Sequence, residues 1–230
     1  MTTDRPANPW QRFRRKVRDE GPLYAALLML NHVVPQSLLD VGVWVVSSAD
    51  LSTFIDAEDP DDDVRWQGSV DAGGLTIPDR KQPDFENLLE CGKLAAVIER
   101  DGGIVAWDLF ATERFIQKKW LWFAFGDRDI YSSWSFVEPE YRGQGLAVQL
   151  ALFAYREFAR RGYLRDYSVT GALNRSALKT SVKVRHWPIG RIAYGRCCGF
   201  TVIRFGRRIR AGFWSADKPL VIDFRDFLET

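Results

Sequence analysis

The residues best suited to chemistry lie in one short stretch near the middle of the chain, residues 135–147. Residues 131–137 are rich in aromatic side chains and serine, which favours a buried or half-buried strand. Pro139 ends that strand, and Gly143 and Gly145 let the backbone turn sharply and approach a ligand closely. A turn of this kind before a helix presents several free backbone N–H groups and the positive end of the helix dipole. The stretch therefore predicts a binding site for a phosphate or pyrophosphate group.

An amphipathic helix is expected to follow this turn. From Leu146 onward the apolar residues recur at helical spacing, and polar or charged residues such as Gln149 and Arg160 occupy the other face. Its apolar positions are Leu146, Ala147, Leu150, Ala151, Ala154 and Phe158. The first turn of this helix must carry the amides that complete the anion site.

Two other interpretations of the glycine turn stay open. An ordinary strand–turn–helix connection needs no ligand, because glycine turns are common. A dinucleotide-binding turn of the form G-x-G-x-x-G would use Gly143 and Gly145, with Asp166 about twenty residues further on as the ribose acceptor. Val148 stands in place of the third glycine, however, and five residues separate the strand from the first one. The dinucleotide interpretation is therefore the weaker of the two.

The same residues resemble a known signature. The run Arg142-Gly143-Gln144-Gly145-Leu146-Ala147 is similar to the R/Q-x-x-G-x-G/A signature of the GCN5-related N-acetyltransferase (GNAT) superfamily, and residues 137–141 resemble its V-x-P-x-Y lead-in. The resemblance implies an α/β (α+β) fold, with a mixed, mostly antiparallel twisted sheet flanked by helices. It also implies that residues 142–147 bind the pyrophosphate of coenzyme A, and that the strand backbone at Phe136 or Val137 holds the pantetheine arm and the acyl carbonyl.

Asn174-Arg175-Ser176 resembles the start of the next family helix, which implies that Asn174 and Ser176 also lie at the cofactor. Beyond that point the pattern departs from the family. Ser181 stands where a tyrosine acid is expected, and Tyr194 is the later candidate for that acid.

Two structures are compatible with this departure. Either the helix carries an insertion and Tyr194 is the acid, or the helix ends near Arg185 and residues 189–205 are sheet. Pro188 and Gly190 break helices, which favours sheet.

The resemblance implies direct acyl transfer from acetyl-CoA or another acyl-CoA to the amine of a small molecule or sugar. No covalent enzyme intermediate is needed, in line with the lack of a recognisable nucleophile–His–Asp set in the sequence. Glu138 at the strand end and Glu113 at the pocket rim are candidate bases. Two alternatives remain, namely a catalytically silent CoA-binding sensor or interaction module, and a long-chain N-acyltransferase that uses an acyl-carrier protein.

Composition limits the partners. The formal net charge is only +2, but residues 142–212 hold thirteen Arg and two Lys against two acidic residues. Coenzyme A accounts for part of this basic character, and no nucleic acid is expected because RNA-binding motifs are missing.

Three cysteines form no disulfide framework, which favours a reducing cytoplasm, and the two histidines lie too far from the cysteines for a metal site. Each histidine is expected to be a packed or surface residue.

Two parts of the chain are expected. Residues 1–36 form a basic and then apolar helical extension, and residues 37–230 form the GNAT-like domain that binds acyl-CoA. The segment 10–34 has three candidate roles, as a core helix, as a peripheral membrane contact, or as a docking site for a carrier protein or subunit.

The remaining predictions concern individual elements. Residues 41–46 read as the first strand, and residues 48–50 as the start of a short helix. Residues 84–91 read as a short helix, followed by a hairpin over 93–110. Residues 119–125 are expected to be sheet or the wall of an acceptor pocket, and residues 167–170 a strand. A last hairpin is expected over 205–209, and a closing edge strand at 221–224.

Overall fold

The computed structural model describes residues 34–35, 38–56, 64–67 and 94–228. Predictions for the extension before residue 34, for most of the acidic cluster between Asp56 and Asp63, and for the helix over 84–91 lie outside these residues. So does the division into two parts at residue 36, which stays a prediction.

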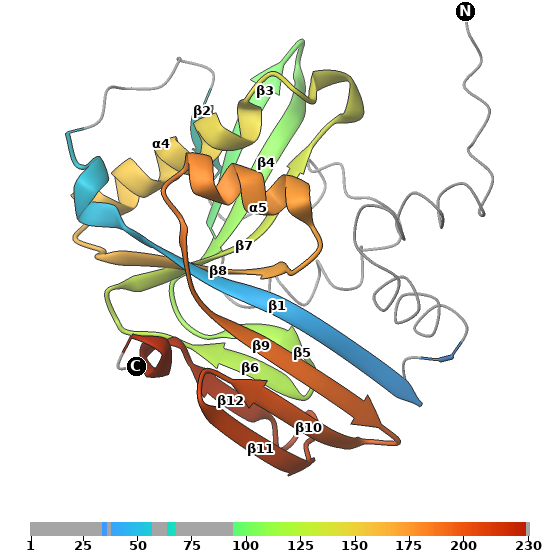
Figure 1. Cartoon of the computed structure of the whole chain (residues 1–230). Helices are drawn as coiled ribbons and strands as arrows, with labels where there is room; N and C mark the ends of the chain where they lie inside the picture. The colour runs from blue at the N-terminus through green and yellow to red at the C-terminus, as the bar shows by residue number, and fades with distance from the viewer. Residues whose placement is uncertain (1–33, 36–37, 57–63, 68–93, 229–230) are drawn as a thin grey trace, which may run out of the picture.

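A nine-stranded twisted sheet forms the body of the structure, in the order β11-β10-β9-β1-β8-β7-β4-β3-β2 (Figure 1). All neighbouring strands run antiparallel except β7 and β8, which are parallel. The fold class expected from the sequence, a mixed and mostly antiparallel sheet flanked by helices, is confirmed. The strands are β1 (Leu39–Asp50), β2 (Val64–Gln67), β3 (Leu94–Arg100), β4 (Gly103–Ala111), β7 (Asp129–Val137), β8 (Arg165–Gly171), β9 (Trp187–Cys197), β10 (Phe200–Phe205) and β11 (Arg208–Phe213).

Two helices cover one face of this sheet, α4 (Leu146–Arg160) and α5 (Arg175–Lys183) (Figure 1). The helix α4 begins at the residue expected from the sequence, and it buries Leu150, Ala154 and Phe158 against the strands. Phe110 and Ile130 belong to the same buried cluster, together with the short 3-10 helix η1 (Leu51–Phe54). This face therefore combines the glycine turn, the two helices and their core.

A second, three-stranded sheet packs on the opposite face, in the order β12-β6-β5. It consists of β5 (Phe115–Lys118), β6 (Leu121–Ala124) and β12 (Leu220–Asp223), followed by the 3-10 helix η5 (Phe224–Phe227). Because side chains alternate along a strand, Tyr131 and Tyr167 point to this side while their neighbours Ile130 and Asp166 point to the helices. The edge strand expected at 221–224 is thus β12 (Leu220–Asp223), which pairs in parallel with β6 and does not close the large sheet, while Phe224 begins η5.

The region after α5 is sheet, as favoured from the sequence. Strand β9 pairs with β1 on one side and with β10 on the other. The first strand in the sequence, β1, therefore lies in the interior of the sheet, between β8 and β9.

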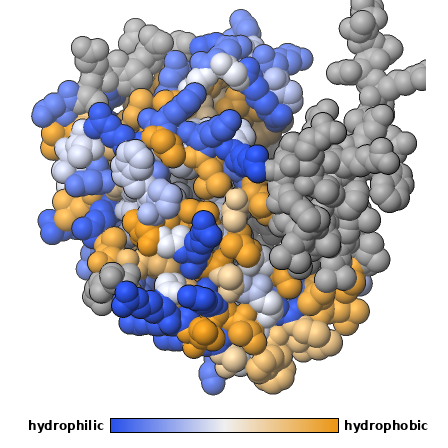
Figure 2. Space-filling model, in the orientation of Figure 1, coloured by the Kyte–Doolittle hydropathy of each residue, from blue (hydrophilic) through white to orange (hydrophobic). Residues whose placement is uncertain are grey.

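Several exposed apolar side chains lie on the outward side of β10 and β11. Phe200 and Phe213 face each other across the two strands with ring centroids 5.2 Å apart, and both are exposed. Figure 2 shows hydrophobic residues gathered at the lower end of the molecule, where these strands lie in Figure 1. Among the described residues, no helix is long and apolar enough to cross a membrane.

Candidate active site

The two parallel strands separate at the centre of the sheet. Register pairing between β7 and β8 runs from Asp129 and Arg165 to Ser132 and Ser168, and then ends. Beyond that point β7 stays paired with β4 alone, and β8 with β1 alone. The two strand ends therefore border a gap that opens towards the glycine turn and the first turn of α4.

A β-bulge in β7 coincides with this separation. Leu109 of β4 pairs with Trp134, and Phe110 pairs with Ser132, so that Ser133 is the extra residue. The Ser133 hydroxyl donates to the carbonyl of Leu109 at 2.9 Å, which holds the bulge in place. The bulge thus lies at the point where β7 and β8 cease to pair.

The backbone hydrogen bonds of β7 decide which amides face the gap. Glu138 N–H donates to the carbonyl of Val105 at 2.9 Å, so this pair belongs to the hydrogen-bonded set of the β4–β7 ladder. Such pairs alternate with non-bonded ones in an antiparallel ladder, so Phe136 also points its N–H towards β4 and Val137 does not. Of the two amides considered from the sequence, that of Val137 is thus the one directed at the gap.

The same alternation directs the amide of Ser135 at the gap. The carbonyl of Val137 is free of β4 as well, because it accepts a hydrogen bond from Arg142 Nε at 3.0 Å. The guanidinium of Arg142 thereby ties the glycine turn to the end of β7.

The glycine turn itself is open and donor-rich. Gly143 and Gly145 both have φ of +84°, a left-handed conformation that side chains disfavour, and a Cβ on either would meet no atom within 4 Å. In the described part of the chain, no backbone hydrogen bond uses the amides of residues 143–147. The turn therefore offers unpaired donors at the positive end of α4, with empty space in front of them.

Side chains of the β3–β4 hairpin contact residues of this turn. Gln144 Oε1 accepts a hydrogen bond from Arg100 Nη1 at 3.0 Å, and the Tyr141 hydroxyl lies 3.4 Å from an Asp101 oxygen. The Gln144 side chain is thus engaged with the hairpin, which leaves the backbone amides as the free donors of the turn.

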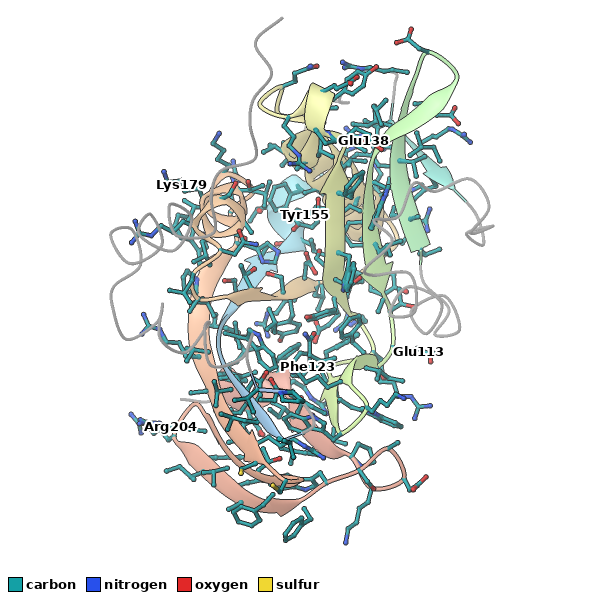
Figure 3. The ribbon with its side chains drawn as sticks, turned by 90° about the vertical axis from the view of Figure 1, so that its right-hand side faces the viewer. Glu113, Phe123, Glu138, Tyr155, Lys179 and Arg204 are labelled. Carbon is teal, nitrogen blue, oxygen red and sulfur yellow. The ribbon has the colours of Figure 1, made fainter. Side chains whose placement is uncertain are left out.

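The other candidates from the sequence lie around this gap or away from it. Asn174 caps α5, where its Oδ1 accepts from Ala177 N–H at 3.1 Å, and Ser176 is exposed in the first turn. Ser181 donates its hydroxyl to Ala177 of its own helix at 3.0 Å. Glu138 follows the last residue of β7, while Glu113 lies towards the opposite end of the molecule (Figure 3).

Tyr194 is a strand residue on the face away from α4 and α5. It is buried among the aromatic residues of the small sheet, and its hydroxyl donates to Asp40 Oδ1 at 2.9 Å. Burial and the Asp40 carboxylate raise the pKa of this phenol. Its packing places Tyr194 apart from the glycine turn.

A buried polar network lies beneath the helices where the two strands separate, and sequence reasoning missed it. Asp166 and His186 are 0% and 1% exposed, with His186 Nε2 2.9 Å from Asp166 Oδ2. Ser168 Oγ lies 3.1 Å from His186 Nδ1. Ser132 donates its N–H to Asp166 Oδ1 at 2.9 Å and its hydroxyl to Oδ2. The weak signal for this network in the sequence is the Asp-x-Ser alternation, which puts both side chains on one face of β8.

Two further ionisable groups share this polar layer. Burial raises the pKa of the Tyr155 hydroxyl, and the charge of Asp166 raises it further. Burial likewise raises the pKa of the Asp108 carboxyl well above its ordinary value, with a second contribution from Asp166. Figure 3 shows Tyr155 between the helices and the strands, below Glu138. Asp166, which is completely buried here, is too enclosed to accept a ribose.

Among the described residues, no group of three or more His, Cys, Asp or Glu side chains is placed to hold a metal ion. The site thus consists of a donor-rich turn, a gap between two strands, and a buried polar network at the bottom of that gap.

Comparison with known proteins gives similarity at the level of structure. No family model matches the sequence, and no curated protein matches it. A GCN5-related N-acetyltransferase from Sphaerobacter thermophilus is similar at 14% identity and a TM-score of 0.43, over 78% of this chain and 58% of that one. A tandem GNAT protein from the clavulanic acid biosynthesis pathway is similar at 16% identity and 0.47, over 86% and 62%.

An aminoglycoside N-acetyltransferase in complex with CoA is similar at 17% identity and a TM-score of 0.41, over 53% of this chain and 89% of that one. This chain therefore spans about three fifths of the length of the first two proteins. Likeness at these identities concerns the fold alone, so any activity must be argued from the residues of this chain. The solved structures to which this chain is similar thus include members of the GCN5-related N-acetyltransferase superfamily.

Proposed function

We propose that this chain is an acyl-CoA-dependent N-acyltransferase, and most simply an N-acetyltransferase, that acts on the amine of a small molecule or sugar. The observation that carries the proposal is the set of unpaired amides at residues 143–147, at the start of α4 and beside the gap between β7 and β8. A pyrophosphate needs several converging donors and close approach of the backbone, and Gly143 and Gly145 leave room for it.

The geometry also supports an extended ligand that runs from the turn into the gap. The pantetheine arm of CoA carries amide groups that can pair with a free strand edge, and Ser135 and Val137 present their N–H groups there. The acyl carbonyl would then reach the bulge at Ser133. Asn174 and Ser176, at the start of α5, are proposed to line the other side of the cofactor.

The proposal extends to the setting of the enzyme. A cytoplasmic location suits a CoA-dependent enzyme, and contact of residues 10–34 with a membrane or a carrier protein stays a proposal. The acyl donor is proposed to be acetyl-CoA or another acyl-CoA.

One observation favours a second candidate, a module that binds CoA without turnover. Neither candidate for the proton donor is directed at the gap, because Ser181 bonds to its own helix and Tyr194 faces the small sheet. Release of CoA thiol from acetyl-CoA in the presence of a panel of small amines separates the two functions, since a silent module binds CoA and releases none.

The binding site is tested by calorimetric titration with CoA of the wild type and of two glycine variants. Gly145→Glu puts a carboxylate into the proposed pyrophosphate site and is expected to weaken binding at least about tenfold, a cost of about 1.4 kcal/mol or more. Gly162→Glu is the matched control, because Gly162 also has positive φ and open space but lies at the other end of α4. Equal affinity in the two variants would show that the turn does not hold the pyrophosphate.

A further inference from the structure

The outward side of β10 and β11, turned away from the small sheet, presents large apolar side chains to solvent. The exposed fractions are 41% for Phe200, 46% for Val202, 67% for Ile209 and 72% for Phe213. Exposed and buried residues alternate strictly along β10, and the alternate side chains pack in the core of the small sheet. The four exposed residues therefore belong to one face of the sheet.

The register continues this face across β9 and β1. Val202 pairs with Gly195 of β9, which pairs in turn with Val41 of β1. One row further on, Ala193 of β9 pairs with Val43, which is 42% exposed. The apolar face thus extends over four neighbouring strands. Exposed apolar areas that are contiguous in this way mark contact sites more often than single exposed side chains do.

The same strands are strongly basic. From the start of β9 to the end of β11, residues 187–213 contain six arginines and no acidic residue. Arg204 lies on the outward side of β10 opposite Ile209, and Arg191 lies on the same side of β9 because it is two residues from Ala193. Arg207 belongs to the turn between β10 and β11. These three exposed arginines form a basic margin at one end of the apolar face.

The charges on β11 argue against a second copy of the chain as the partner. Strand β11 is the last strand of the large sheet, so two copies could pair along it. Arg208 and Arg210 alternate with apolar residues on this strand, and Arg208 already pairs with Asp226 at 2.6 Å. Two such strands side by side would bring arginines together, which is unfavourable. The basic character instead suits an anionic partner.

We propose that the apolar face docks the protein on the surface of an anionic membrane. Phe200, Val202, Ile209 and Phe213 enter the boundary between lipid headgroups and acyl chains, and the basic margin contacts the lipid phosphates. A membrane supplies an apolar layer and a continuous negative surface together, which matches an apolar face whose charged side chains are all cationic. The attachment is peripheral, because the inserted groups are side chains of strands whose other face packs on the small sheet.

Docking in this way leaves the glycine turn in water. The strand order places β10, β9, β1 and β8 between β11 and β7, the strand that leads into the turn. Figure 3 shows Arg204 at the opposite end of the molecule from Glu138, which directly follows β7. Membrane docking and CoA binding therefore use separate surfaces, and each can be measured without the other.

Vesicle sedimentation of the full chain tests the charge requirement. One set of vesicles is pure phosphatidylcholine, and the other is equal parts phosphatidylcholine and phosphatidylglycerol. We expect binding to the anionic vesicles alone, and weaker binding as added salt screens the charges. Arg204→Glu is expected to lower the affinity at least about tenfold. Lys179→Glu is the matched control, because Lys179 is exposed and carries the same charge on α5, far from Arg204 (Figure 3).

A second pair of variants tests the apolar requirement. Phe213→Ser removes the most exposed ring of the face and is expected to weaken binding to the anionic vesicles at least about tenfold. Val221→Ser is the control, because Val221 is 46% exposed but lies on the small sheet. Melting temperatures show that each variant is folded. Calorimetric titration with CoA is expected to give the same affinity for all of them.

Three results would overturn the inference. The first is a folded wild type that does not bind anionic vesicles. The second is binding that Arg204→Glu and Phe213→Ser leave unchanged, which would assign the attachment to another part of the chain, such as residues 10–34. The third is a dimer in solution that Phe213→Ser dissociates, without vesicle binding, which would make the face an interface between copies. A wild type that binds vesicles but not CoA would contradict the proposed function alone.

Discussion

Tyr194 shows how an individual residue can match a family role and still serve the fold. Its hydroxyl bonds to Asp40, which also pairs with Lys118, and its ring packs 4.7 Å from that of Trp44. Tyr194, Asp40 and Lys118 thus form a polar link inside the aromatic core beneath the sheet.

Tyr194→Phe removes this link while keeping the ring. We expect the free energy of unfolding to fall by about 1 kcal/mol, the typical cost of one lost hydrogen bond, with turnover changed little. Urea unfolding and initial rates on the same preparation measure both. A turnover that falls tenfold or more with stability unchanged would instead identify Tyr194 as the proton donor.

Asp108 makes the pH dependence of folding testable. Its pKa is raised by burial and by Asp166, so the folded protein binds its proton more tightly than the unfolded chain does. The stability it contributes is therefore complete below the unfolded pKa of an aspartate and is lost as the pH rises through the folded pKa.

Asp108→Asn removes the cost of the buried charge. The variant is expected to be more stable than the wild type at pH 8, and this advantage is expected to disappear as the pH falls below about 4. Melting temperatures across that pH range measure the effect, with exposed Asp127→Asn as the control. A destabilisation of equal size at every pH would show that the carboxyl serves as a structural hydrogen-bond partner.

At the scale of elements, variants at the start of α5 can distinguish two roles of Asn174, namely capping of the helix and binding of the cofactor. Asn174→Ala removes the cap of this helix and is expected to cost about 0.5–2 kcal/mol of stability. Asn174→Asp should restore the cap. CoA affinity measured on both variants then decides the residue's role: affinity that stays low in the restored variant means that Asn174 contacts the cofactor.

The packing of β1 on β9 depends on Gly42. A Cβ at this position would come within 2.5 Å of the Tyr194 ring, so Gly42→Ala forces either this buried ring or strand β1 to shift. We expect it to destabilise the protein by about 1–3 kcal/mol in thermal or urea unfolding.

Gly195→Ala is the control on the neighbouring strand, because its Cβ would meet Val41 at an ordinary 3.8 Å. Equal stability of the two variants would mean that β1 can shift at little cost.

At the scale of the whole molecule, the part of the site formed by residues close together in the sequence could be predicted. The pairings between strands far apart in the sequence could not. The turn, β7 and α4 follow from glycines, a proline and helical periodicity within about 30 residues of sequence. The small sheet joins β5 and β6 to β12, which lies roughly a hundred residues later, and β1 pairs with β8 and β9, which lie still further along the chain from it. Such pairings are set by packing of the complete core, which periodicity does not encode.

The buried polar network escaped prediction for a related reason. His186 is isolated in the sequence and follows a helix, so it reads as a packed or surface residue. The left-handed conformation of Arg185 and the stacking of Tyr155 bring it to Asp166 and Ser168. Only the path of the backbone after α5 makes the three residues neighbours.

The central claim is that acyl-CoA lies with its pyrophosphate on the glycine turn and its pantetheine arm in the gap between β7 and β8. Hydrogen–deuterium exchange of the full chain, with and without saturating CoA, tests it at the level of single peptides. We predict slower exchange for the amides of residues 143–147 and of Ser135 and Val137, and no change in the turn at residues 206–207. Slower exchange confined to other parts of the molecule, with residues 135–147 unaffected by bound CoA, would contradict the claim.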